Sequence, residues 1–115
     1  MKWTYLAKEI FDLFKFPDTL PDDVTVYFMT HTEEDQNGNL KMKTAGKLLD
    51  NLITPEGMFT IVLGAEMKDG EYKFKVKKER NAEPFKTPMD MFDDTYIDND
   101  LNVVHDTIIE YYKED

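Results

Sequence analysis

The dipeptide Asp69-Gly70 is the feature that most constrains the fold, because it is a favoured two-residue turn of a β-hairpin. Residues 58–67 and 71–80 flank this turn, and the second of these segments alternates apolar with charged side chains. A turn here makes the numbers of opposed residues sum to 139, which sets every apolar residue of the second strand opposite an apolar residue of the first. Because turn chemistry and side-chain pattern give the same register, we predict an antiparallel hairpin.

Three other segments are predicted to be helices. Apolar residues recur at spacings of three and four over residues 2–15, and Pro17 is expected to end that helix. A short helix is predicted over residues 44–53. A last helix is predicted over residues 101–114, because Asp100 is a suitable N-cap and apolar residues follow it at helical spacing.

The fold class predicted from these elements is α+β. Residues 24–31 are β-branched and aromatic and indicate a strand, whereas residues 89–100 are ambiguous between a strand and a loop. We therefore expect a small antiparallel sheet of three or four strands packed with two or three helices, in the order α-β-α-β-β-(β)-α. The chain length favours one compact domain that includes residues 1–115.

Charge is distributed unevenly along the chain. Residues 81–115 contain ten acidic residues and two lysines, a net charge of −8 out of −10, whereas residues 41–80 carry +3. An excess of this size repels the phosphates of nucleic acid, so direct nucleic-acid binding is not expected. It attracts basic proteins, and the sequence therefore predicts a basic protein partner.

The acidic residues of the last predicted helix are spaced by four and form a ladder. Residues four apart lie about 6 Å apart along a helix axis, close to the spacing of successive phosphates on one nucleic-acid strand. The ladder could therefore imitate DNA, or it could be the ordinary solvent face of an amphipathic helix. Its members are Asp98, Asn102, Asp106, Glu110 and Glu114.

A second acidic cluster surrounds aromatic residues between residues 90 and 100. Aromatic anchors with a charged rim are typical of protein interfaces, although the aspartates could equally be turn formers around a buried core. The predicted partner-binding residues from both clusters are Asp90, Phe92, Asp93, Asp94, Tyr96, Asp98, Asp100, Asp106, Glu110 and Glu114.

Several kinds of chemistry are disfavoured by the composition. The chain has no cysteine and no serine, and its two partial calcium-loop patterns, at residues 33–44 and 98–109, lack the later ligands. His31 and His105 lack the spacing and the cysteine partners of a zinc motif. Lysines around residues 73–80 form a basic strip that could bind phosphate or balance the acidic elements. No catalytic residue, metal site or cofactor is predicted.

The leading functional hypothesis is a small acidic, non-enzymatic protein that binds and inhibits a basic partner, most plainly a nucleic-acid-processing enzyme. Immunity proteins, antitoxins and phage anti-defence proteins act in this way. A small enzyme or small-molecule-binding domain, with a pocket between sheet and helices and Tyr27, His31, Tyr72 or His105 as polar groups, is one alternative. A structural or accessory subunit is another. The absence of cysteine, of a signal peptide and of a long apolar segment favours a cytoplasmic location.

Overall fold

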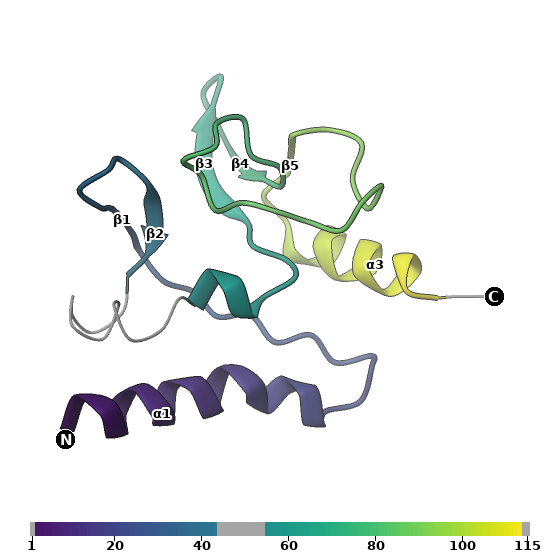
Figure 1. Ribbon diagram of the computed structural model, residues 1–115. Coiled ribbons are helices and arrows are strands. Elements are labelled where there is room, and N and C mark those ends of the chain that lie inside the picture. The colour runs from purple at the N-terminus through teal and green to yellow at the C-terminus, as the bar shows by residue number, and fades with distance from the viewer. Residues whose placement is uncertain (1, 44–54, 114–115) are drawn as a thin grey trace. The chain divides into compact units, whose positions relative to one another are not determined.

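The hairpin around Asp69-Gly70 is confirmed in the computed structural model (Figure 1). Strand β3 (Gly64–Lys68) pairs antiparallel with β4 (Glu71–Lys75), and the opposed residues have the predicted register, with Met67 opposite Tyr72. Asp69 and Gly70 both have positive φ angles, 54° and 84°, which is the backbone of a type I′ turn. Turn chemistry alone therefore fixed this part of the sheet.

Both strands of the hairpin are shorter than predicted. Val62 exchanges backbone hydrogen bonds of 2.9 and 3.0 Å with Lys86, and the Val76 amide donates to the Thr95 carbonyl at 2.8 Å. The two chain segments thus diverge beyond Gly64 and Lys75 and take different neighbours. Leu63 and Val76 do not pair, although both lie in the core.

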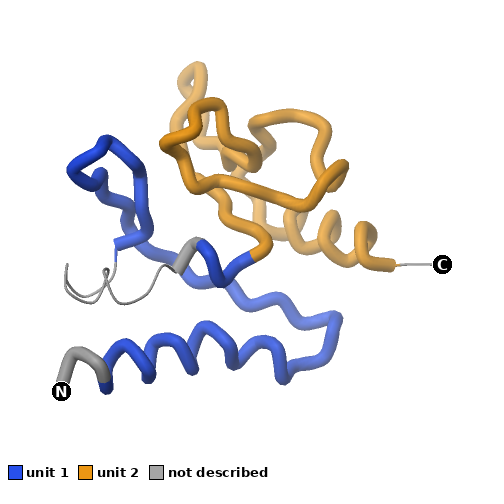
Figure 2. The backbone as a smooth tube through the Cα atoms, viewed as in Figure 1, with its two compact units in different colours: residues 1–59 blue, residues 60–115 orange. Residues whose placement is uncertain are grey.

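The structure describes residues 2–43 and 55–113, and these fall into two compact units (Figure 2). Unit 1 is residues 1–59 and unit 2 is residues 60–115. The expectation of a single domain stays a prediction. The helix predicted over residues 44–53 and the acidic residue Glu114 lie outside the described residues.

Unit 1 begins with helix α1 (Lys2–Lys15), as predicted, followed by a 3₁₀ turn, η1 (Phe16–Thr19), that contains Pro17. On this helix Ala7 is buried, whereas Leu13 is exposed. The Phe14 ring meets the rings of Phe28 and Phe59 edge-on, at centroid distances of 5.0 and 5.1 Å. Aromatic contacts therefore connect α1 to the segments that follow it, including the 3₁₀ turn η2 (Pro55–Met58) that precedes Phe59.

The strand predicted over residues 24–31 is wrong. Pairing begins only at β1 (Thr32–Glu34), which is antiparallel to β2 (Leu40–Met42). The Asp35 carboxylate accepts hydrogen bonds from the amides of Asn37 and Asn39, at 2.8 and 2.9 Å, and these bonds fix a tight loop. Residues 24–30 are extended by sequence preference but form no strand in the structure.

Unit 2 contains a three-stranded antiparallel sheet in the order β3-β4-β5, with β5 (Tyr96–Asp98) pairing with β4. The ambiguity over residues 89–100 thus resolves into a loop followed by a short strand. The chain ends its described part with helix α3 (Leu101–Tyr111), which Asp100 caps through a 2.9 Å hydrogen bond from the Asn102 amide. The α+β class and the N-cap are confirmed, but there are two separate sheets rather than one.

Both faces of the sheet in unit 2 are covered at the end away from the hairpin turn. On one face, Val76 forms a core cluster with Met91 and Phe92, and Ile108 and Tyr111 of α3 pack against it. On the other face, the ring of Phe85 lies so close to Gly64 that an added Cβ would meet it at 2.5 Å. Among the described helices, none is long and apolar enough to cross a membrane.

Candidate protein-binding surface

The acidic ladder is only partly available for binding. Asp106 and Glu110 are exposed on α3, and neither forms an ion pair with a described residue. Asp98, by contrast, lies at the end of β5, where its carboxylate accepts a 3.1 Å hydrogen bond from the Lys73 ammonium opposite it. The ladder therefore starts with a neutralised residue and continues with two open carboxylates.

Asp100 also has a local structural role. Its carboxylate accepts a hydrogen bond from the Asn102 amide and so satisfies one of the open donors at the start of α3. This capping role explains the aspartate at position 100 without requiring a partner protein. Its other lone pairs remain exposed to solvent.

The three aspartates of the loop before β5 are exposed. Asp90 has a φ of 65° and lies in a turn in which the Met91 amide donates to the Pro88 carbonyl at 3.1 Å. Asp93 offers its carbonyl to the Lys77 ammonium at 3.1 Å, so its carboxylate stays open. No described residue forms an ion pair with Asp90, Asp93 or Asp94.

Phe92 is not an exposed anchor, which corrects the prediction from the sequence. Its side chain is buried in the core cluster with Val76 and Met91, because the turn at Asp90 directs the following residues inward. Tyr96 is half-buried, and its hydroxyl lies 3.2 Å from a Glu79 carboxylate oxygen and 3.4 Å from one of Glu66. Neither ring therefore presents a free apolar surface next to the aspartates.

A different pair of apolar side chains is exposed beside the acids. The Tyr111 hydroxyl donates a 2.7 Å hydrogen bond to the Met89 carbonyl, which ties the turn at residues 88–91 to the last turn of α3. The Met89 side chain is 81% exposed, and that of Tyr112 is exposed as well. Sequence reasoning missed both, because only the tertiary hydrogen bond brings the turn and the helix end together.

The cluster around Lys75 was also missed. This lysine is 3% exposed, and its ammonium lies 2.7 Å from a Glu83 oxygen, 2.9 Å from one of Glu79 and 3.9 Å from one of Glu66. The sequence places Lys75, Glu79 and Glu83 at intervals of four residues, but no helix forms there, so that spacing did not identify the cluster.

The pKa values of Lys75, Glu79 and Glu83 are displaced toward the charged forms. Burial disfavours the charge on Lys75, but hydrogen bonds to Glu83 and Glu79 outweigh it and raise the lysine pKa. Burial likewise opposes ionisation of Glu83, yet the bonds from Lys75 and from the Glu79 amide lower its pKa. The hydrogen bond from Lys75 lowers the pKa of Glu79. Groups fixed as ions in this way stabilise the fold and do not exchange protons near neutral pH.

The basic strip of the hairpin is largely used inside unit 2. Lys73 pairs with Asp98, Lys75 is buried among glutamates, and Lys77 donates to the Asp93 carbonyl. Lys73 and Lys75 therefore balance acidic residues, the second of the two roles considered for the strip. A phosphate-binding function of the strip has no support in these contacts.

The polar groups considered for an enzyme are divided between the two units. Tyr27 and His31 belong to unit 1, whereas Tyr72 and His105 belong to unit 2, and Tyr72 is 69% exposed on the hairpin. Among the described residues, no group of three or more histidine, aspartate or glutamate side chains could hold a metal ion.

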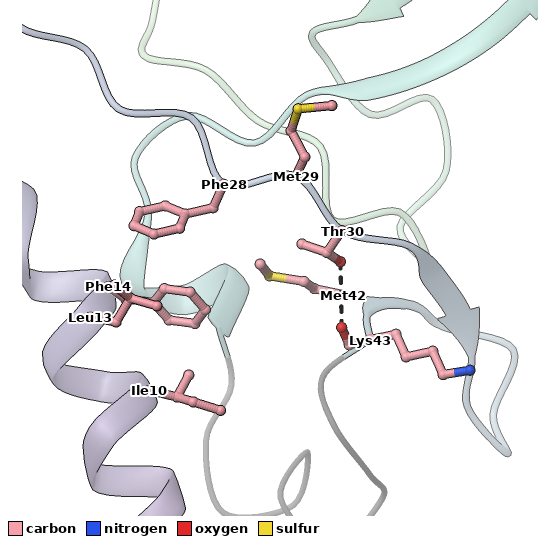
Figure 3. Close-up of a pocket in the computed structure, with 8 residues that line it drawn as sticks. All are labelled: Ile10, Leu13, Phe14, Phe28, Met29, Thr30, Met42 and Lys43. Carbon is pink, nitrogen blue, oxygen red and sulfur yellow. Dashed lines mark hydrogen bonds between the residues drawn. The ribbon is translucent and has the colours of Figure 1, made fainter.

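One pocket of about 230 Å³ lies in unit 1 (Figure 3). Its lining side chains come from α1, from the segment after Phe28 and from the end of β2, and none is among the four groups above: Ile10, Leu13, Phe14, Phe28, Met29, Thr30, Met42 and Lys43. The Lys43 amine points away from the apolar side chains and lies 3.7 Å from a Glu33 oxygen. The pocket is thus apolar and smaller than the roughly 300 Å³ at which ligand sites usually begin.

Comparison with known proteins finds no relative: the sequence matches no family model, and no curated protein or solved structure is significantly similar to it.

Proposed function

We propose that this chain is a small acidic, non-enzymatic protein that binds and blocks a basic partner in the cytoplasm, and that the partner is a nucleic-acid-processing enzyme. One observation carries the proposal. Five of the exposed carboxylates in unit 2 have no ion pair with a described residue, although Lys73 and Lys75 of the same unit are paired: Asp90, Asp93, Asp94, Asp106 and Glu110. Unpaired charges of one sign favour encounter with a surface of the opposite sign.

The apolar part of the proposed interface is the pair Met89 and Tyr112. Both side chains are exposed, and the hydrogen bond between Tyr111 and Met89 holds the turn carrying Asp90 close to the helix end carrying Glu110. Apolar anchors within a charged rim supply binding energy that charges alone do not give in water. Asp98 and Asp100 contribute less to binding in this proposal, because they pair with Lys73 and cap α3.

Charge reversal tests the proposal. Asp90→Lys, Asp93→Lys and Asp94→Lys are combined in one variant, and the immobilised protein is used to capture proteins from the source cell. The matched control reverses three exposed acids of unit 1: Glu9→Lys, Asp22→Lys and Asp23→Lys. Each variant changes the net charge by the same amount, so only the position of the charge differs.

The proposal expects wild type and control to capture a basic nucleic-acid-binding protein that duplex DNA displaces, and the first variant to lose it. Association should slow as salt rises from about 0.05 to 0.2 M, since screening shortens the reach of surface charge. Equal capture by all three proteins would show that the acidic surface does not bind the partner. Capture that duplex DNA does not displace would show that the partner is not a nucleic-acid-processing enzyme.

A further inference from the structure

The outer edge of strand β3 has no neighbour among the described residues. β3 lies at one end of the sheet order β3-β4-β5, so its second edge faces away from the hairpin (Figure 1). Neither a proline nor a bulge, two of the devices that block a strand edge, interrupts Gly64–Lys68. An open, regular edge is a template for one more antiparallel strand.

The backbone groups that face outward can be assigned from the sheet itself. The Val76 amide donates toward β5, to the Thr95 carbonyl, so alternate residues of β4 face β5 and those between them face β3. Lys73 and Lys75 therefore face Glu66 and Gly64, their partners in the register. By the same alternation, the amides and carbonyls of Ala65 and Met67 point away from β4.

Two large apolar side chains are exposed next to this edge. Met67 and Tyr72 are opposite each other in the register, on the same face of the sheet, and they are 58% and 69% exposed. Cross-strand pairs of this kind gain stability when neighbouring strands extend the apolar row. A further strand at the β3 edge would give Met67 a second apolar neighbour.

The charges on the opposite face make β3 complementary to itself. Glu66 and Lys68 flank Met67 and have opposite signs. If two copies pair antiparallel about a two-fold axis at Met67, each Glu66 lies opposite Lys68 of the second copy. An axis at Ala65 would instead set Glu66 opposite Gly64 and leave no charge pair.

We propose that two copies of this chain pair through β3, with Met67 opposite Met67 on the two-fold axis, and so form a continuous six-stranded sheet. The apolar row then runs from Tyr72 through both Met67 side chains to Tyr72 of the second copy. The local charge permits this approach, because residues 60–80 carry a net charge of +2 in a chain of −10. None of the acids proposed to bind a partner lies in β3.

Disulfide trapping tests this pairing, since the chain contains no cysteine of its own. Met67→Cys places one thiol on the axis, where Cα atoms of a hydrogen-bonded pair are about 5.5 Å apart, within the range that a disulfide spans. The matched control is Tyr72→Cys, which is equally exposed on the same face but separated from its copy by three strand spacings of about 4.8 Å. Under mild oxidation, Met67→Cys should cross-link at least about tenfold faster than Tyr72→Cys.

Sedimentation supplies a measurement that does not depend on a new thiol. A contact of two short strands buries less than the roughly 1,200 Å² of a stable interface, so the dimer is expected at high chain concentration only. Met67→Pro removes the outward amide that the second copy needs and leaves the bonds to β4 intact, and Met67→Thr keeps that amide. The proline variant should stay monomeric at concentrations where wild type and Met67→Thr associate.

Three results would overturn the proposal. They are equal cross-linking of the two cysteine variants, a wild type that is monomeric throughout, and a folded Met67→Pro variant that associates like wild type. If another segment of the same chain or another protein occupies the β3 edge, the two cysteine variants cross-link equally or the wild type stays monomeric. If the proline variant does not fold, Lys68→Glu replaces it, because it sets Glu66 against a second carboxylate and should likewise abolish association.

Discussion

Lys75 is a residue of unit 2 that is both buried and charged. A cation that is 3% exposed remains charged because carboxylate oxygens of Glu83 and Glu79 lie within 2.9 Å of its ammonium. The Phe85 ring centroid lies 5.9 Å from the same ammonium and belongs to the segment that covers this face. The arrangement gives the loop over residues 79–85 a fixed attachment to β4.

Replacing Lys75 with methionine is expected to destabilise the protein by about 3 kcal/mol, because Glu83 then remains buried without its cation. Urea denaturation followed by circular dichroism measures the loss. Adding Glu83→Gln to Lys75→Met should recover part of it, since the uncompensated charge disappears. If the two changes add without coupling, the ion pair is not what holds this loop.

The pH dependence of stability follows from the same residues. The pKa of Glu83 in the folded protein lies below its ordinary value of 4.5, so the unfolded chain binds protons first as the pH falls. The stability contributed by Glu83 is therefore complete above pH 4.5 and is lost as the pH falls through the folded pKa. For Lys75, with a raised pKa, the contribution is complete below 10.5 and is lost as the pH rises through the folded value.

Glu83→Gln should consequently cost about 2 kcal/mol at pH 7 and progressively less as the pH falls below 4.5. Urea midpoints at pH 7, 5 and 3 measure this difference. Glu110→Gln is the control, because it makes the same chemical change at an exposed carboxylate, and its midpoint should follow that of wild type. A cost that is constant with pH would mean that Glu83 acts through packing rather than through its charge.

At the scale of elements, a strand forms where a partner strand is available. Residues 71–75 became a strand because the Asp69-Gly70 turn returns the chain alongside them. Residues 24–30 have stronger β-forming side chains, yet the structure assigns them to no strand. The β propensity of a segment is thus a weaker determinant than a turn at a fixed position.

The close approach of Phe85 to Gly64 gives a prediction about β3. Gly64→Ala adds a Cβ that would meet the Phe85 ring at 2.5 Å, so the ring or the strand has to shift. We expect a loss of about 1–3 kcal/mol by overpacking. Gly57→Ala is the control, since an added Cβ there has no atom within 4 Å, and it should change the urea midpoint little. A neutral Gly64→Ala would show that the segment over this face is not tightly packed.

At the scale of the whole molecule, the two compact units divide the chain near its middle. The buried apolar residues of unit 2 include Val76, Phe85 and Val104, whereas Ala7 is the one buried apolar side chain in the described part of unit 1. Units of this size bury only about 60% of their unfolded surface and are marginal on their own. Whether the two units unfold together or separately can therefore be measured.

Trp3 is the only tryptophan of the chain and belongs to unit 1, so its fluorescence is used as the probe of that unit. If the units unfold separately, circular dichroism, which records both units, should show two transitions, and Gly64→Ala should lower the urea midpoint of one of them and leave the Trp3 midpoint unchanged. Coincident shifts of both probes would instead establish one cooperative domain, as the chain length predicts.

Local sequence was sufficient to predict the features that depend on a few neighbouring residues. The type I′ turn at Asp69-Gly70, the register it fixes, the N-cap at Asp100 and the end of α1 before Pro17 all follow from local backbone preferences. The tertiary structure alone decided which side chains are covered. Phe92 is buried, Lys75 is enclosed by glutamates, and Met89 is exposed beside the end of α3, because burial depends on which distant segment folds over each face.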